Sequence, residues 1–238
     1  MISAPVLELR NIDAGYGPFR ALFDVSFEIP AGGATALLGS NGSGKTTVAR
    51  LASGLISPVS GSIWVDGVNM TGERTYKYTR AGISHAPEGR SVFATLTVEE
   101  NLTLSLRRRL GVKNLQAGLE SAFSIFPQLA QRRGQLAGTL SGGEQRMLSL
   151  ARPLVEKPKL LIADELSLGL APIIVNFVYE LLARIRASGT AVLVVEQHVG
   201  HALDFCDHAI LLSHGAIAWQ GPANEARSVV NTQLFKTT

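Results

Sequence analysis

Apolar and polar residues follow two different rhythms in the first third of the chain. Residues 7–10 and 25–29 alternate strictly between apolar and polar positions, and a period of two predicts strands with one buried and one solvated face. Residues 34–38 form a short run of small and apolar residues that ends in a glycine-rich loop. The stretch 45–53 that follows is typical of a helix, and Gly54 closes it.

The middle of the chain, roughly residues 89–155, carries the clearest helix signals. Residues 97–100 form a Thr-x-x-Glu capping box at the start of one predicted helix. Apolar residues then recur at every fourth position, as they do on one face of a helix: Val98, Leu102, Leu106 and Leu110. We therefore expect a mostly helical segment here.

From residue 160 onward the pattern of buried strands returns. Residues 160–163 and 191–195 are fully apolar, and a predicted helix over 172–187 separates them. Apolar strands joined by a helix indicate parallel pairing in a sheet that is covered on both faces. Residues 209–213 and 216–219 predict a final hairpin. Together these patterns favour an α/β core that is interrupted by a helical insert.

Composition narrows the class of protein. The chain has 238 residues, 46% of them apolar and 17% charged, with a net charge of +3. This balance favours a globular, soluble protein and argues against a dedicated nucleic-acid binder. One cysteine, Cys206, excludes an internal disulfide framework. The longest apolar run, at 191–195, is far shorter than the roughly 18 residues needed to cross a bilayer, and residues 1–10 carry no export signal.

A phosphate-binding loop pattern follows the apolar run at 34–38. Its residues are Gly39, Ser40, Asn41, Gly42, Ser43, Gly44, Lys45 and Thr46, and Thr47 completes the expected nucleotide contacts. Glycines let successive backbone amides point into one concavity in front of a helix N-terminus. We expect Lys45 to reach the β- and γ-phosphates and the Thr46 hydroxyl to bind Mg²⁺. The alternative is a Gly/Ser-rich turn that binds no ligand.

Two adjacent acids, Asp164 and Glu165, follow the apolar strand at 160–163. An acid at such a strand end can hold hydrated Mg²⁺, and a second acid can polarise the attacking water. Because adjacent residues on a strand point to opposite faces, the two carboxylates need not compete for one role. An Asp-Glu pair after a strand is common and is weak evidence by itself. Together with the phosphate-loop pattern that begins at Gly39, it indicates a nucleotide-hydrolysing site.

The stretch from Leu140 to Gln145 reads Leu-Ser-Gly-Gly-Glu-Gln. As a plain helix start it is a capping box between Ser141 and Glu144. Its two glycines cost about 1 kcal/mol each against alanine, which makes sense if a ligand must approach the backbone amides. We therefore predict a second phosphate contact here. Pro153 predicts a kink or an early end of this helix.

These three motifs occur in the order and spacing of ABC-type ATPase subunits, which the chain resembles from Leu7 to about Gly221. The resemblance implies a P-loop NTPase (RecA-like) α/β core with an N-terminal antiparallel β region and an inserted helical subdomain. The core would comprise residues 1–88 and 156–238, and the helical subdomain residues 89–155. It further implies that Ser141, Gly142, Gly143 and Glu144 contact ATP bound to the phosphate loop of an opposite subunit. Two chains would then sandwich two nucleotides, and a lone monomer would be a poor ATPase.

Three further positions take their roles from the resemblance alone. Tyr16 stands where the family has an aromatic residue that stacks on adenine, although an ordinary aromatic in a turn is the alternative. Glu88 stands where the family has a Mg²⁺-sensing glutamine, and Gln197 where it has a catalytic histidine. A neutral amide at Gln197 can donate a hydrogen bond to the γ-phosphate but cannot carry a proton.

The finer pattern points to one subgroup. Residues 87–90 (Pro-Glu-Gly-Arg), 96–102 and 195–197 are similar to the second of the two ATPase subunits in branched-chain amino acid importers. This implies ATP and Mg²⁺ as cofactors, transmembrane permease subunits as partners, and a substrate-binding protein that acts through them. The dimer partner would be a second, non-identical ATPase, with a second copy of this chain as the alternative. The chain would be peripheral at the cytoplasmic face of a prokaryotic cell membrane, with no nucleic-acid partner.

Other functions compete with this interpretation. A transporter of urea, a short amide or another solute would leave the motor residues unchanged. A non-transport ABC-type ATPase would need a long coiled coil in the insert or two cassettes in one chain, and neither fits in 238 residues. A GTPase would carry an Asn-Lys-x-Asp segment, which the sequence lacks.

Overall fold

The computed structural model describes residues 4–89 and 92–233. Arg90, the last residue of the Pro-Glu-Gly-Arg motif, lies outside the described residues. The described chain forms two compact units. The first comprises residues 1–85, 159–165 and 189–238, and the second comprises residues 86–158 and 166–188. The second unit thus contains the predicted helical segment together with the helix at 172–187, which the sequence analysis places in the core. The subdomain boundaries stay a prediction.

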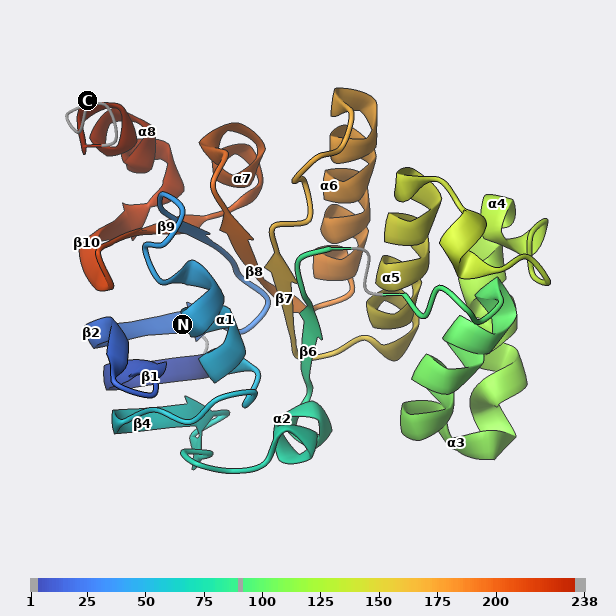
Figure 1. The fold of residues 1–238 in the computed structure, drawn as a ribbon, viewed down its shortest axis with the longest axis horizontal. Coiled ribbons are helices and arrows are strands. Elements are labelled where there is room, and N and C mark those ends of the chain that lie inside the picture. The colour runs from blue at the N-terminus through green and yellow to red at the C-terminus, as the bar shows by residue number, and fades with distance from the viewer. Residues whose placement is uncertain (1–3, 90–91, 234–238) are drawn as a thin grey trace. The chain divides into compact units, whose positions relative to one another are not determined.

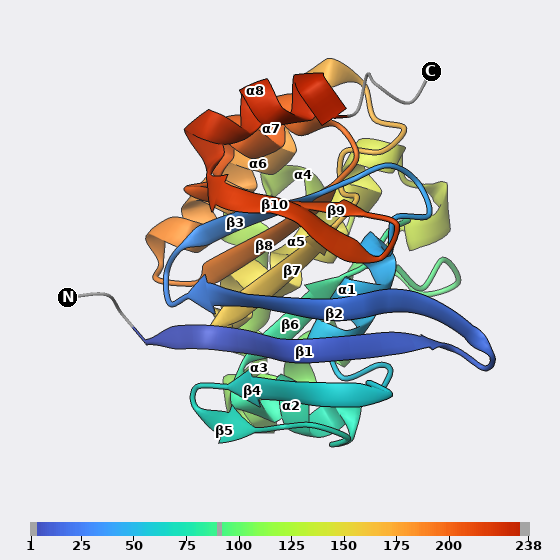
Figure 2. The same cartoon turned by 90° about the vertical axis from the view of Figure 1, so that its left-hand side faces the viewer.

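A four-stranded antiparallel sheet in the order β2-β1-β4-β5 forms one layer of the first unit (Figure 2). Its strands are β1 (Pro5–Tyr16), β2 (Phe19–Pro30), β4 (Ser60–Val65) and β5 (Val68–Asn69). In β1, Leu7 and Leu9 are buried while Glu8 is half-buried and Arg10 is exposed. The predicted alternation between a buried and a solvated face is confirmed.

A six-stranded sheet in the order β10-β9-β3-β8-β7-β6 forms the other layer. Its strands are β3 (Ala34–Leu38), β6 (Ile83–Ala86), β7 (Leu160–Asp164), β8 (Ala191–Glu196), β9 (His208–Ser213) and β10 (Ala216–Pro222). β8 lies between β3 and β7 and pairs with both in parallel, and every residue of these three strands is buried. The predicted parallel pairing and the final hairpin, β9 with β10, are confirmed.

The core of the first unit contains buried side chains from both sheets and from α1. The helices of this unit are α1 (Lys45–Ala52), α2 (Thr75–Ala81), α7 (Val199–Phe205) and α8 (Ala223–Gln233). α1 packs against β1 and β2 of one sheet and β7 and β8 of the other, while α8 covers β9 and β10 (Figure 2). This packing fixes the loop that joins β3 to α1.

The second unit is helical (Figure 1). It contains α3 (Val98–Ile125), α4 (Pro127–Ala130), a 3-10 turn (Ala137–Thr139), α5 (Gly142–Glu156) and α6 (Pro172–Ala187). The predicted capping box at Thr97 is present, and α3 is interrupted at Gly111, whose φ of 72° is not helical. α5 packs against α3 and α6 and continues through Pro153 for one further turn.

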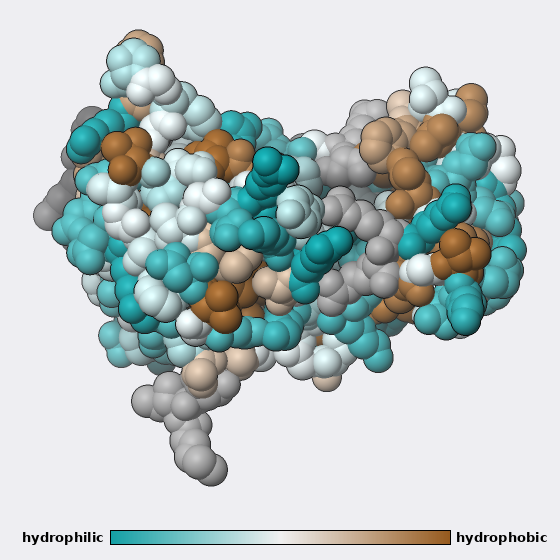
Figure 3. Space-filling model, turned by 90° about the horizontal axis from the view of Figure 1, so that it is seen from below, coloured by the Kyte–Doolittle hydropathy of each residue, from teal (hydrophilic) through white to brown (hydrophobic). Residues whose placement is uncertain are grey.

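No helix of the described residues is long and apolar enough to cross a membrane. On the face drawn in Figure 3, hydrophobic side chains form several separate patches among hydrophilic ones.

Candidate nucleotide-binding site

The predicted phosphate loop joins β3 to α1, and its glycines are required by the surrounding packing. Gly44 has a φ of 106°, and a Cβ there would lie 2.6 Å from a methyl carbon of Leu22. At Gly39 a Cβ would lie 2.4 Å from the carbonyl oxygen of Leu212. Side chains at either position would displace the loop from the sheet. The loop conformation thus depends on glycine.

Lys45, the first residue of α1, turns back over the loop instead of pointing into solvent. Its side chain is 4% exposed, and its Nζ donates to the carbonyl oxygens of Gly39, at 3.0 Å, and Ser40, at 3.1 Å. The same Nζ lies 3.5 Å from Oε1 of Glu165. The ammonium group is therefore held at the loop, where phosphate oxygens could replace the two carbonyls as its partners.

The other predicted loop residues differ in burial. Ser40, Asn41 and Gly42 are exposed at the bend, whereas Thr46 is half-buried and Thr47 is buried in α1. Among the described residues, the buried Oγ of Ser43 has no hydrogen-bond partner. A buried hydroxyl without a partner is costly, so this atom is a further acceptor or donor available at the loop.

Asp164 and Glu165 enter the same region from β7. Asp164 is the last residue of the strand and its side chain is 2% exposed. Glu165 lies beyond the strand with a φ of 47°, and its backbone amide donates to the carbonyl of Val195 at 2.8 Å. The expected separation of the two carboxylates by strand alternation is wrong, because Glu165 lies beyond the end of β7. The left-handed turn at Glu165 separates them and directs that side chain to Lys45.

His85 is a neighbour of this site that the sequence analysis does not identify. It lies on β6, and its Nε2 is 3.5 Å from Oδ2 of Asp164. The side chain is 10% exposed. A single histidine ahead of Pro87 carries no motif, and only the pairing order of the sheet brings it beside β7.

The buried charges of this cluster favour a cation. Two carboxylates, those of Asp164 and Glu165, are buried here. The Lys45 ammonium lies 3.5 Å from Glu165, whereas Oδ1 of Asp164 has no hydrogen-bond partner among the described residues. Carboxylate and hydroxyl oxygens are the hard donors that Mg²⁺ prefers. The described residues contain no group of three or more His, Cys, Asp or Glu that could hold a metal ion. The donor set thus fits an ion that substrate phosphates also ligate.

Tyr16 ends β1 and stays accessible. Its ring is 42% exposed, and its hydroxyl accepts a hydrogen bond from Arg50 at 3.0 Å. The Arg50 guanidinium also lies 5.8 Å from the centre of the ring, which restrains the orientation of the aromatic face. Gln197 is half-buried directly after β8, and His198 caps α7.

The Ser141 motif lies in the second unit and forms the predicted capping box. The Ser141 hydroxyl donates to Oε2 of Glu144 at 2.8 Å, and the Ser141 amide donates to the same oxygen at 2.9 Å. Nε of Arg132 lies 2.9 Å from the other carboxylate oxygen. Burial alone would raise the pKa of Glu144, but the Ser141 hydrogen bonds and the Arg132 charge outweigh it and hold the pKa below its usual value.

The two glycines of this motif have different surroundings. A Cβ at Gly143 would lie 3.2 Å from the Cδ1 of Ile174, whereas a Cβ at Gly142 would meet nothing closer than Leu170, at 4.0 Å. Packing therefore accounts for Gly143 only. Gly142 borders a cavity of about 260 Å³ that the exposed residue Glu88 also lines.

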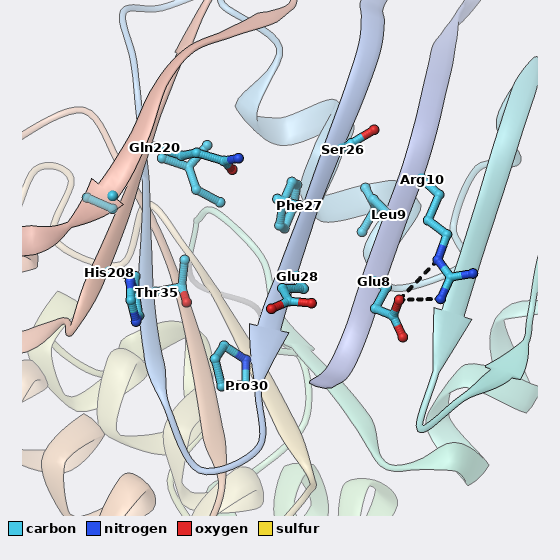
Figure 4. Close-up of a pocket in the computed structure, with 13 residues that line it drawn as sticks. Glu8, Leu9, Arg10, Ser26, Phe27, Glu28, Pro30, Thr35, His208 and Gln220 are labelled. Atoms are coloured by element: carbon cyan, nitrogen blue, oxygen red, sulfur yellow. Dashed lines mark hydrogen bonds and ion pairs between the residues drawn. The ribbon is translucent and has the colours of Figure 1, made fainter. Parts of the chain in front are cut away.

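Lys45, Asp164 and Glu165 thus lie together in the first unit, which also carries Tyr16 and Gln197. The Ser141 motif and Glu88 belong to the second unit. A further cavity of about 460 Å³ lies between the strands of the two sheets of the first unit, lined by Glu28, Thr35 and His208 among others (Figure 4). No predicted site residue lines it.

Comparisons with known proteins agree with these motifs. The sequence profile described as ABC transporter matches residues 22–167. The chain is 41% identical, over 89% of its length and 91% of the relative, to the high-affinity branched-chain amino acid transport ATP-binding protein BraG of Pseudomonas aeruginosa. It is 36% identical, over 92% of its length and 93% of the relative, to the probable branched-chain amino acid transport ATP-binding protein LivF of Archaeoglobus fulgidus.

The chain is also similar to more distant proteins. The lipopolysaccharide export system ATP-binding protein LptB of Escherichia coli K12 is 30% identical, over 92% of this chain and 91% of that protein. A crystal structure of an ATP-binding cassette of an ABC transporter in its ADP conformation superposes with a TM-score of 0.84. That structure is 25% identical and covers 97% of this chain and 96% of its own.

Proposed function

Because the chain belongs to the ABC transporter family of ATP-binding proteins, we propose that it is the ATP-hydrolysing motor subunit of an importer of branched-chain amino acids. The structural observation that supports the motor role is the buried cluster of Lys45, Asp164 and Glu165 beside the loop. The likeness to BraG and LivF supports the cargo, since both carry branched-chain amino acid transport in their names.

The chain's own residues divide the work of binding and hydrolysis. Lys45 and the amides of the loop hold the β- and γ-phosphates of ATP, and the ring of Tyr16 stacks on the adenine. The Thr46 hydroxyl and the carboxylate of Asp164 hold Mg²⁺. When bound, Mg²⁺ neutralises charge on the β- and γ-phosphates.

Glu165 orients the attacking water and accepts its proton. Its left-handed backbone and its contact with Lys45 support this role, because they direct the carboxylate toward the phosphate loop. Two further residues complete the proposed assignment. Glu88 contacts the metal ion, and the side-chain amide of Gln197 donates a hydrogen bond to the γ-phosphate.

The second unit acts on a nucleotide held by another chain. The γ-phosphate contacts the start of α5 at Ser141, Gly142 and Gly143. Glu144 stabilises this helix start through the capping box with Ser141. Closure of two ATPase subunits around ATP then moves permease subunits in the membrane, with this chain peripheral at the cytoplasmic face. The second ATPase is non-identical in this proposal. A homodimer is the alternative.

Affinity purification of the chain from its native membrane, followed by identification of its partners by mass, tests the proposal. We expect two permease subunits, a second ATPase and an amino-acid-binding protein. Uptake of leucine by vesicles that carry the purified complex should then require ATP. Uptake of urea or a short amide in place of leucine would contradict the proposed cargo. Recovery of soluble partners alone would contradict the proposed role in transport.

A further inference from the structure

The contact between His85 and Asp164 has no role in the proposed reaction so far. His85 comes from β6 and Asp164 from the adjacent strand β7, so the sheet itself holds the two side chains next to each other. Nε2 of His85 lies 3.5 Å from Oδ2 of Asp164. Both side chains are at least nine-tenths buried.

Two atoms of this contact are unusual because they lack partners. Nε2 of His85 and Oδ1 of Asp164 are buried and make no hydrogen bond within the described structure. Leaving a buried polar atom unpaired costs about 1–3 kcal/mol, so such atoms are rare without a reason. Nε2 of His85 is 3.5 Å from Oδ2 of Asp164, so an approach of about 0.3 Å would make it an ordinary N–H···O hydrogen bond.

We propose that His85 is a positioning residue for the metal-binding carboxylate. Its Nε2–H donates to Oδ2 of Asp164, which fixes the plane of the carboxylate and leaves Oδ1 for the divalent cation of the nucleotide. The inference rests on the proposed function, since the cation is the one that ATP carries to this site.

The physical need for such an anchor follows from the chemistry of aspartate. The terminal torsion of an aspartate side chain has broad, roughly two-fold minima, so an unanchored carboxylate can turn its plane away from a cation. Lys45 is not placed to anchor it, because in the described structure its Nζ contacts two carbonyl oxygens and Glu165. Hydrogen-bond donors to ligating groups typically contribute about 10-fold to 100-fold in metal affinity.

The test measures binding of Mn²⁺, as a paramagnetic substitute for Mg²⁺, to the full chain in the presence of a non-hydrolysable ATP analogue. The electron paramagnetic resonance signal of free Mn²⁺ gives the dissociation constant directly. We expect His85→Leu to raise this constant by about 10-fold or more. Binding of the analogue without a divalent ion should change less than about two-fold. His208→Leu, a change at an exposed histidine of the same unit, is the matched control.

A pair of amide variants separates positioning from folding. The side-chain nitrogen of His85→Gln reaches about as far as Nε2 of histidine, whereas that of His85→Asn is too short to meet Oδ2. Gln should restore Mn²⁺ binding to within about three-fold of the natural chain, and Asn should not. This pair decides the question even if His85→Leu fails to fold.

Equal Mn²⁺ binding by the Gln and Asn variants and the natural chain would overturn the proposal and leave His85 as a packing residue. A natural chain that binds neither the analogue nor Mn²⁺ would instead overturn the proposed function. The two failures are therefore distinguishable.

Discussion

The phosphate loop of the first unit and the Ser141 cap of the second differ in how fully their polar groups are hydrogen-bonded. Among the described residues, Oδ1 of Asp164 and Oγ of Ser43 in the first unit are buried without a hydrogen-bond partner, and the Lys45 ammonium lies 3.5 Å from the carboxylate of Glu165. In the second unit, the polar groups of the Ser141 cap have partners: the carboxylate of Glu144 accepts two hydrogen bonds from Ser141 and forms an ion pair with Arg132. The contrast indicates that the first unit is built around a ligand's charge. The second unit is built to hold a helix start rigid, and it offers the bare backbone at Gly142.

This difference predicts that substitutions in the first unit alter chemistry most. The largest effect should come from Glu165→Gln, which removes the base but keeps the size and the contact with Lys45. Turnover of ATP by the assembled transporter should fall by about 100-fold to 10,000-fold, while ATP binding persists. The measurement is phosphate release, with Glu225→Gln on the exposed face of α8 as control. Normal turnover would show that Glu165 is not the base.

Lys45→Ala should weaken nucleotide binding itself. Loss of charge-assisted hydrogen bonds to phosphate costs about 1.5–3 kcal/mol, or roughly 10-fold to 100-fold in affinity. Equilibrium binding of a fluorescent ATP analogue measures this, and Lys77→Ala, at a lysine paired with Glu73 on the surface of α2, is the control. Equal affinities of the two variants would contradict the role of Lys45.

Gly142→Ala sharpens the comparison in the second unit. An added methyl group meets nothing closer than 4.0 Å in the part of the chain that the structure describes, so the free energy of unfolding should change by less than about 1 kcal/mol. Turnover in the assembled transporter should nevertheless fall about 10-fold, because the methyl group would occupy the place where the γ-phosphate of ATP bound to another chain approaches. Gly134→Ala, also in open space, is the matched control. Equal turnover of both variants would contradict the proposed role of Gly142 in the nucleotide site.

The smallest effect concerns the cap. The folded pKa of Glu144 is held below its usual value of 4.5, so its contribution to stability is full above that value. It is lost as the pH falls through the lowered pKa of the folded state. Glu144→Gln should therefore lower stability at pH 7 by about 1 kcal/mol. It should also flatten the acid limb of a plot of unfolding free energy against pH. An unchanged acid limb would contradict the cap.

Periodicity and motifs predict the elements that carry a clear local pattern, which include β1, β2, β3, α1, α5, α6 and β7 to β10, but they do not predict β4, β6, α7 or α8. The bounds of β3 and of the helix at Pro172 follow from the sequence directly. α2 escapes such reasoning, since Tyr78 is its one fully buried side chain and no period results. His85 and the turn at Glu165 escape it for a different reason. Their positions depend on strand order and backbone geometry, which no local pattern encodes.

We propose that the nucleotide site of one chain is completed by the start of α5 from another. The most direct measurement is ATP turnover per chain over a roughly 100-fold range of concentration, alone and with the second ATPase of the same transporter. The account predicts low turnover at high dilution that rises with concentration or with the added subunit. Turnover per chain that stays constant over the whole range, with and without the second subunit, would contradict it.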